Sequence, residues 1–150
     1  MSKRASSSRT EHASALALEI RTLIGKLRRT LRDQAGPGDF NTSESSVLLR
    51  LEKDGPATVS SLARAEAMRP QSMSAVIAPL EAAGLVSGAP DPKDGRQTIF
   101  SLTQKCRKRM EDRRAAKQDW LTKAILAKLS AEEQAELASA LKSLARLAED

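Results

Sequence analysis

The segment that most restricts the possible folds of this chain is a helix that ends at a glycine and leads into two short strands. Residues 80–86, LEAAGLV, have the pattern of the last turn of an amphipathic helix, a glycine stop and a strand near 85–87. The charged stretch 91–96, DPKDGR, contains an Asp-Gly turn dipeptide before a second strand predicted near 97–102. This order predicts a β-hairpin attached to a helix, with Arg96 near the tip of the hairpin.

Three short helices are predicted before the hairpin, over 42–53, 58–67 and 70–83. Thr42 or Ser43 is expected to cap the first of them, and Thr58 the second, because their hydroxyls accept hydrogen bonds from free amides. The last two helices are joined by few residues, which is the sequence form of a helix-turn-helix.

The helix over 70–83 has one apolar face and one small, polar face. Its apolar residues recur at helical spacing: Met73, Val76, Ile77 and Leu80. The opposite face carries Gln71, Ser72, Ser74 and Ala75. In a helix-turn-helix the second helix enters the major groove of DNA, where Ser and Gln side chains exchange hydrogen bonds with base edges. Arg69, just before this helix, is within reach of a phosphate or a guanine, and Pro79 is expected to bend the helix or loosen its last turn.

The hairpin supplies a second predicted contact with DNA. An Arg at a hairpin tip suits the minor groove, whose negative potential deepens where the groove narrows, so Arg96 is predicted to enter it. Lys93 is expected to contact the phosphate backbone. Asp91 and Asp94 would repel phosphates, and we expect them to cap the turn or orient Arg96. The basic residues at 105–117 are expected to contact phosphates near their start and to be solvated further along.

Both ends of the chain are predicted to be long amphipathic helices. The first covers about 11–34, and the second about 104–129. A last helix begins with the capping-box pattern of Ser130 and Glu133. A long helix with a narrow apolar stripe indicates a surface for a partner. Residues 1–10, rich in Ser, Lys and Arg, are predicted to be a disordered basic arm.

Composition limits the function classes. The net charge of +6 favours a polyanionic partner, and aromatic residues at 2% argue against single-strand binding by base stacking. No long apolar run indicates a membrane span, and one cysteine excludes an intramolecular disulfide, which predicts a protein of the reducing cytoplasm. No catalytic, metal-binding or cofactor-binding pattern is recognised, so we expect neither an enzyme nor a metal or cofactor.

Taken together, these segments resemble the MarR family of winged helix-turn-helix transcriptional regulators. The resemblance covers nearly the whole chain from about Glu11. Its most specific part is Asp91-Pro-x-Asp-x-Arg96 followed by Leu102-Thr103. The chain departs from the family pattern at Gly95, where Arg is common, and at Pro79 in the second helix of the motif.

The resemblance implies a mainly α fold with a small β-hairpin, in which residues 42–103 form a winged helix-turn-helix lobe. Residues 11–38 and 104–150 would be the dimerisation helices of a homodimer that binds a pseudo-palindromic operator in double-stranded DNA. It also implies a repressor that releases DNA when a small molecule, of unidentified chemistry, binds. We expect much of the dimer surface to come from Leu16, Ile20, Leu23, Leu137, Leu141 and Leu144.

Two alternatives remain open from the residues alone. The chain could be a helical dimeric interaction module whose charged face binds an acidic protein. It could also be a regulator that senses oxidants through Cys106, where nearby Lys and Arg would lower the thiol pKa. A DNA-binding protein should retard a short palindromic duplex with a steep salt dependence, which an interaction module would not do.

Overall fold

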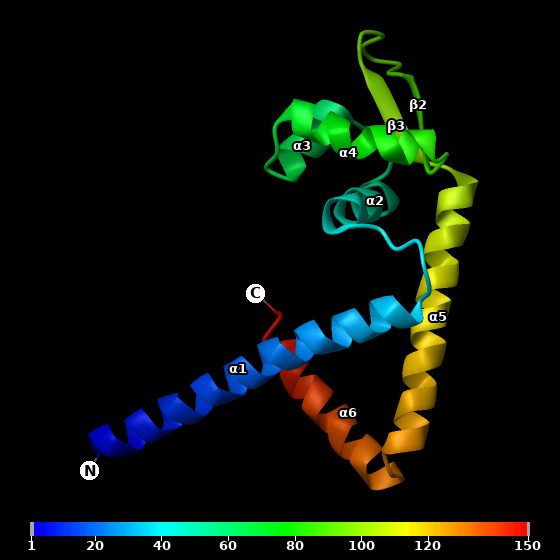
Figure 1. Cartoon of the computed structure of the whole chain (residues 1–150). Helices are drawn as coiled ribbons and strands as arrows, with labels where there is room; N and C mark the ends of the chain where they lie inside the picture. The colour runs from blue at the N-terminus through cyan, green and yellow to red at the C-terminus, as the bar shows by residue number, and fades with distance from the viewer. Residues whose placement is uncertain (1, 150) are drawn as a thin grey trace. The chain divides into compact units, whose positions relative to one another are not determined.

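The computed structural model describes residues 2–149, with side chains from residue 7 onward, and is mainly helical with one small antiparallel sheet (Figure 1). This confirms the predicted fold class. In chain order the elements are α1 (Ser2–Gln34), α2 (Thr42–Asp54), β1 (Ala57–Thr58), α3 (Val59–Ala65), α4 (Pro70–Ala82), β2 (Val86–Pro90), β3 (Thr98–Leu102), α5 (Gln104–Lys128) and α6 (Ala131–Arg146). The chain divides into two compact units, Pro37–Arg114 and the remainder, and α5 contributes to both.

The helices of the central unit begin at side-chain caps. Asn41 caps α2: its side chain accepts from the Glu44 amide at 2.8 Å, and the Glu44 carboxylate accepts from the Asn41 amide at 3.1 Å. The prediction of Thr42 or Ser43 was therefore wrong, because Asn41 has the extended backbone of a cap and completes the reciprocal pair with Glu44. The predicted cap of α3 is confirmed, since Thr58 Oγ1 accepts from the Ser61 amide at 3.1 Å.

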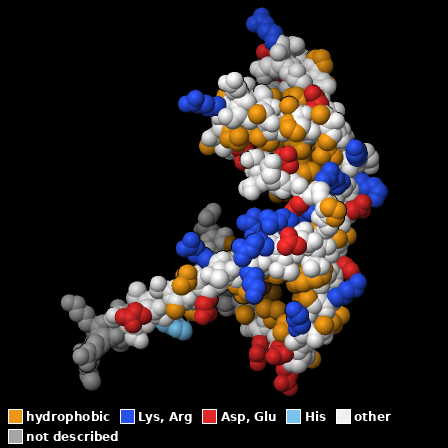
Figure 2. Space-filling view, viewed as in Figure 1, with side chains coloured by type: hydrophobic (Ala, Val, Ile, Leu, Met, Phe, Trp, Pro, Cys, Tyr) orange, Lys and Arg blue, Asp and Glu red, His pale blue; other side chains and the backbone are white. Residues whose placement is uncertain are grey.

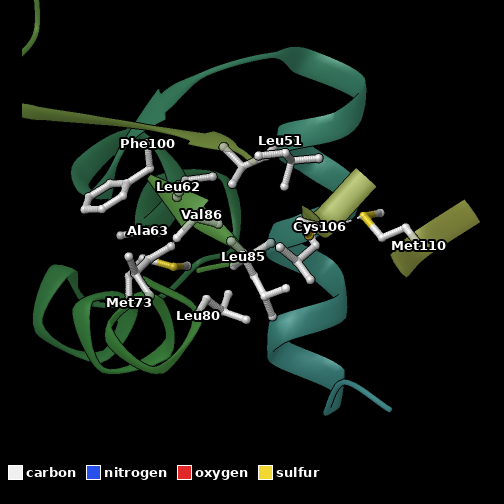
Figure 3. Close-up of a cluster of buried hydrophobic side chains, with 14 residues drawn as sticks. Leu51, Leu62, Ala63, Met73, Leu80, Leu85, Val86, Phe100, Cys106 and Met110 are labelled. Carbon is white, nitrogen blue, oxygen red and sulfur yellow. Dashed lines mark hydrogen bonds between the residues drawn. The ribbon is translucent and has the colours of Figure 1, made fainter. Parts of the chain in front are cut away.

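The hydrophobic core lies in the central unit and takes buried residues from all of its elements except β1, whose partly buried Ala57 packs against it. Ten of its side chains are labelled in Figure 3. The buried residues are Val47, Leu48, Leu51, Leu62, Ala63, Met73, Ile77, Leu80, Leu85, Val86, Phe100, Leu102, Cys106 and Met110. Phe100 is the one aromatic member of this set, so the core is otherwise built from aliphatic and sulfur-containing side chains. Helix α4 and the hairpin strands therefore pack on the same core.

The sheet has the strand order β1-β3-β2, with both pairs antiparallel. In β3 the side chains of Phe100 and Leu102 are buried, while that of Ile99 points to the other face and pairs with Thr58 of β1. The alternation typical of a half-buried strand is therefore present. β1 was not predicted, and β2 extends to Pro90, beyond the predicted end near residue 87.

Arginines of α5 hold the segment that precedes α2. Arg109 donates to the Gly38 carbonyl and lies 4.5 Å from the centre of the Phe40 ring, a cation–π contact. Arg113 Nη2 lies 2.8 Å from Asp39 Oδ1. Because these arginines bind protein groups, the distal part of the basic run is not simply solvated, contrary to our expectation.

In the other unit, α1 begins at Ser2, so residues 2–10 are helical instead of the predicted disordered arm; Met1 lies outside the described residues. Residues 3–9 contain no Gly or Pro, and a helix already formed propagates readily through Lys, Arg, Ala and Ser. The predicted capping box of α6 is confirmed: the Glu133 amide donates to Ser130 Oγ at 3.2 Å and the Ser130 amide to Glu133 Oε2 at 2.8 Å. Among the described residues, no helix is both long and apolar enough to span a membrane.

Candidate nucleic-acid interface

The reversal between α3 and α4 is made by backbone hydrogen bonds around an alanine. The Met68 amide donates to the Ala63 carbonyl at 2.8 Å, and the Ala67 amide donates to the Arg64 carbonyl at 3.3 Å. Ala67 has φ +53°, the left-handed conformation for which glycine is usual just after a helix. The chain then enters α4 at Pro70, so α3 and α4 form the predicted helix-turn-helix.

Helix α4 separates its two faces as predicted. Its buried residues are Met73, Ile77 and Leu80, and its exposed residues near the start are Gln71, Ser72, Ser74 and Ala75. Within the described part of the chain, the side chains of Gln71, Ser72 and Ser74 make no hydrogen bond. They are therefore available to a ligand that approaches this face.

The first turn of α4 is also open to an anion. Arg69 occupies the N-cap position but makes no side-chain hydrogen bond to the helix, and Pro70 has no amide hydrogen. The Met73 amide donates back to the Arg69 carbonyl at 3.0 Å, which leaves the amides of Gln71 and Ser72 as the free donors of this turn. A helix start with free amides favours a phosphate, and the exposed Arg69 adds a positive charge.

Helix α4 continues through Pro79 to Ala82 and then ends in a Schellman motif. Gly84 has φ +70°, its amide donates to the Glu81 carbonyl at 2.9 Å, and the Leu85 amide donates to the Leu80 carbonyl at 2.9 Å. The buried side chains of Leu80 and Leu85 complete the motif. The predicted glycine stop is confirmed, and it sets the direction in which the chain enters the hairpin.

Thr103, just before α5, and Lys105, in its first turn, hold the end of α4, a role that was predicted for neither of them. Thr103 Oγ1 donates to the Gly84 carbonyl at 2.7 Å and accepts from the Cys106 amide at 3.1 Å, so one hydroxyl joins the end of α4 to the start of α5. Lys105 Nζ donates to the Ala83 carbonyl at 2.9 Å, at the negative end of the α4 dipole. The Leu-Thr pair after the second strand was the signal for this junction, but spacing alone does not reveal its partners.

The tip of the hairpin is shaped by two aspartates. Asp91 Oδ1 accepts from the Lys93 amide at 2.9 Å, and Asp94 Oδ1 accepts from the Arg96 amide at 3.1 Å. The Gln97 amide donates to the Asp94 carbonyl at 3.0 Å and closes the turn. The expectation that these aspartates cap the turn is confirmed. Their carboxylates are directed to backbone amides, and the side chains of Lys93 and Arg96 are exposed.

The two glycines of the hairpin have different constraints. A Cβ atom on Gly88 would lie 2.7 Å from Thr98 Cγ2 and 3.1 Å from Phe100 Cε1, so β2 requires glycine there to reach β3. Gly95 has open space around its Cα atom and needs no left-handed backbone. A residue with a side chain would fit at Gly95, so the tip of this hairpin has one side chain fewer than its backbone conformation allows.

Charge in the central unit is nearly balanced, with twelve Lys and Arg against ten Asp and Glu. Several of the cations are committed to protein partners. Arg50 Nε lies 2.8 Å from Glu66 Oε1 and holds the pKa of that carboxyl below its usual value, and Arg114 does the same for Glu52. Among the described residues, the side chains of Arg69, Lys93 and Arg96 form no ion pair. The cations beside α4 and on the hairpin that form no ion pair are thus the residues predicted to contact DNA.

Cys106 belongs to the core. Its side chain has no exposed surface, and Sγ lies 3.8 Å from Met110 Sδ (Figure 3). Burial raises the pKa of this thiol, and this effect exceeds the opposing effect of Arg109 and Arg107. The thiolate that reacts with oxidants is therefore disfavoured, which counts against redox sensing. Among the residues described, no three His, Cys, Asp or Glu side chains gather to hold a metal ion.

The residues predicted for the dimer surface lie on α1 and α6 in the other unit. None of the described residues of this unit is buried. The large apolar side chains of α1 and α6 are instead exposed: Leu16 by 46%, Leu23 by 64%, Leu137 by 38% and Leu141 by 52%, whereas Ile20 and Leu144 are intermediate. Amphipathic helices of this length without buried side chains have an apolar stripe that is uncovered in the single chain.

The sequence model of the MarR family matches residues 40–98. An uncharacterised HTH-type transcriptional regulator of Mycobacterium leprae is 34% identical over 111 residues, which are 74% of this chain and 78% of that protein. A second HTH-type transcriptional regulator, from Bacillus subtilis, is 30% identical over 57% of this chain and 60% of its own length.

Solved structures agree with the sequence matches. A crystal structure of a Pseudomonas aeruginosa protein is 34% identical and superposes with a TM-score of 0.78, covering 90% of this chain and 94% of that one. A Staphylococcus aureus MepR mutant, crystallised bound to an oligodeoxyribonucleotide, has a TM-score of 0.69 over 89% of this chain and 97% of its own, at 19% identity. The fold is therefore one that solved transcriptional regulators share.

Proposed function

This chain belongs to the MarR family of transcriptional regulators, and we propose that it is a homodimeric repressor that binds a pseudo-palindromic operator in double-stranded DNA. One observation carries the proposal. Helix α4 and the hairpin strands pack on the same hydrophobic core. The exposed polar side chains at the start of α4 and the exposed Arg96 side chain of the hairpin are therefore held in one unit, and they make no side-chain hydrogen bond or ion pair with other described residues.

In this proposal α4 lies in the major groove with its first turn nearest the bases. Gln71, Ser72 and Ser74 would donate and accept hydrogen bonds at base edges, and Ala75 would allow close approach or contact a thymine methyl group. The free amides at the start of α4 and the Arg69 guanidinium would hold a phosphate beside them. Thr103 and Lys105 act as positioning residues, because they fix the end of α4 to α5.

The hairpin would grip the adjacent minor groove. Arg96 extends from a turn whose backbone is already fixed by Asp91 and Asp94, so little conformational freedom remains for the turn to lose on binding. Its guanidinium would enter the groove, and Lys93 would contact a phosphate. With Gly95 in place of a further side chain, Arg96 carries the main interaction of this hairpin.

A second copy of the chain is the proposed occupant of the apolar stripes on α1 and α6. The exposed leucines of these helices include Leu16, Leu23, Leu137 and Leu141, with Ile20 and Leu144 beside them. Covering them would supply the buried apolar area that this unit lacks within one chain. Twofold symmetry would place two α4 helices one DNA turn apart, about 34–36 Å, which matches half-sites centred about 10 base pairs apart.

Repression would follow from occupancy of the operator, and release from a small-molecule effector, as family membership suggests. An effector of this kind must bind one arrangement of the dimer more tightly than another, because only differential affinity shifts a conformational equilibrium. Such a regulator would work in the cytoplasm, where its single cysteine stays reduced. A scan of small organic acids and phenols for a shift in melting temperature, followed by DNA titrations, would identify effectors.

The DNA-binding part of the proposal is tested by titrating the protein into a labelled duplex that it has selected from random DNA. We expect Arg96→Ala to weaken binding about 5- to 150-fold, because an Arg contact in a groove contributes about 1–3 kcal/mol. Lys123→Ala, an exposed cation of α5, is the matched control and should bind like the wild type. Equal affinities for Arg96→Ala and wild type would contradict the role of the hairpin.

The dimer is tested by sedimentation equilibrium at micromolar concentration. We expect a dimer for the wild type and for Arg96→Ala, and a shift toward monomer for Leu23→Asp, which places a charge in the apolar stripe. A stable, folded wild-type monomer would contradict the homodimer. Binding to acidic proteins with no retardation of any duplex would instead support the interaction module.

A further inference from the structure

One cluster of positive charge lies outside the winged helix, in α1. Residues 21–32 of α1 include five basic residues and no acidic residue, whereas the whole central unit has only two more basic residues than acidic ones. Figure 2 shows blue Lys and Arg side chains gathered on this half of α1. We call the set the α1 basic face: Arg21, Lys26, Arg28, Arg29 and Arg32.

Helical geometry places most of these cations in one row. With about 3.6 residues per turn, Arg21, Arg28 and Arg32 point in nearly the same direction, at spacings of about 10 Å and about 6 Å along the axis. Gly25 lies within this row, and the space around its Cα atom is open. Because the apolar stripe of Ile20, Leu23, Leu27 and Leu31 points in another direction, a partner that covers this stripe leaves the row free.

These cations are not explained by interactions within the chain. All five are exposed, and only Arg32 has an ion pair among the described residues, a 3.8 Å contact with the neighbouring Asp33. Cations favour the C-terminal end of a helix, but this effect is confined to the last turn. Arg32 is the one basic residue in the last turn of α1, so the helix dipole does not account for the other four.

We propose that the α1 basic face binds the phosphate backbone of DNA, as a second contact that is independent of sequence. This inference rests on the proposed DNA-binding function. A row of cations spread along a helix suits a polyanion, because duplex DNA carries one negative charge per about 1.7 Å of its axis. A small anion would instead need donors that converge on one point. Arginine guanidinium groups match phosphate oxygens with two parallel hydrogen bonds.

The test is the salt dependence of DNA affinity in full-length protein. The variant combines Arg21→Gln, Arg28→Gln and Arg29→Gln, and its control combines Lys128→Gln, Lys142→Gln and Arg146→Gln, three exposed cations of α5 and α6. Both variants remove the same charge. Fluorescence anisotropy between about 50 and 200 mM salt gives the slope of log affinity against log salt concentration. Each phosphate that the protein neutralises adds about 0.9 to the magnitude of this slope.

We expect the slope of the α1 variant to decrease in magnitude by about 2 to 3, and that of the control to stay within about 0.5 of wild type. Sedimentation and circular dichroism should show unchanged assembly and helix content, because Gln is a good helix former. Equal slopes for both variants would overturn the inference while leaving DNA binding intact. Weaker binding of the α1 variant to anionic vesicles, with unchanged DNA binding, would also overturn it. A wild-type chain that binds no duplex would instead refute the proposed function.

Discussion

The guanidinium of Arg113 lies 2.8 Å from the carboxylate of Asp39 and joins α5 to the segment before α2. The Arg113 side chain is 10% exposed and that of Asp39 is 25% exposed, so the pair is largely removed from water. Nη1 of Arg113 also approaches the Pro37 carbonyl at 3.4 Å. Because a guanidinium is costly to bury without its counterion, this contact is predicted to stabilise the central unit.

Replacing Asp39 with Ala should lower the free energy of unfolding by about 2 to 3 kcal/mol, somewhat less than for a fully buried pair, since water partly screens Asp39. Urea denaturation measures this change. Asp33→Ala removes the exposed partner of Arg32, and should change stability by at most about 0.5 kcal/mol. Similar changes in unfolding free energy for the two substitutions would show that the contact between Arg113 and Asp39 stabilises the protein no more than an exposed ion pair does.

Ala67→Gly should stabilise the protein. Ala67 has φ +53°, where a side chain costs about 1 kcal/mol or more relative to glycine. The greater freedom of Gly in the unfolded chain offsets part of this gain, so we expect a net increase of about 0.5 to 1 kcal/mol. Ala65→Gly, at the last residue of α3, should instead destabilise by up to about 1 kcal/mol. A loss of stability in Ala67→Gly would contradict the turn geometry.

Glu66 makes stability depend on pH. Its carboxylate accepts from Arg50 at 2.8 Å and from Ser46 Oγ at 2.7 Å, and both contacts lower its pKa below 4.5. The unfolded chain therefore takes up a proton first as pH falls, so the contribution of Glu66 is complete above about pH 4.5 and is lost as pH falls through its lower folded-state pKa.

Comparing wild type with Glu66→Gln by chemical denaturation between pH 6 and pH 3.5 isolates this contribution. The difference in unfolding free energy should shrink toward the acidic end. Glu52, whose pKa is lowered by Arg114, titrates with the same sign and leaves part of the acid sensitivity in the variant. A difference that is constant over this range would show that Glu66 does not titrate differently in the folded state.

Cys106 should behave as a core residue. Because its side chain is fully buried and its thiol pKa is raised, native protein should resist iodoacetamide far longer than protein in denaturant. Hydrogen peroxide should leave DNA affinity unchanged. Rapid labelling of native protein, or a loss of DNA binding on oxidation that disappears in Cys106→Ala, would revive the redox-sensing alternative.

The sequence predicted those features of the interface that depend on local spacing. Met73, Ile77 and Leu80 follow the helical period, so the exposed position of Gln71 and Ser72 could be read from it. Gly84 marked the helix end because few other residues adopt its backbone conformation.

What the sequence did not reveal depends on tertiary pairing. β1 has two residues, too few for an alternation, and exists because Thr58 and Ala57 pair with β3. The residues Gly88 to Pro90 disfavour strands, yet pairing with β3 and the edge position of β2 hold them extended. The binding of Arg113 to Asp39 joins residues far apart in the chain, and charge spacing along one helix carries no information on such partners.

Selection of bound sequences from random double-stranded DNA tests the central claim most directly, because it reports binding, sequence preference and symmetry together. We expect an enriched inverted repeat with half-sites centred about 10 base pairs apart, the separation of two α4 helices in a symmetric dimer. Enrichment should be weaker in Arg96→Ala and unchanged in Lys123→Ala. Recovery of no enriched sequence, or of a single asymmetric site with no repeat, would contradict a symmetric pair of winged helices on DNA.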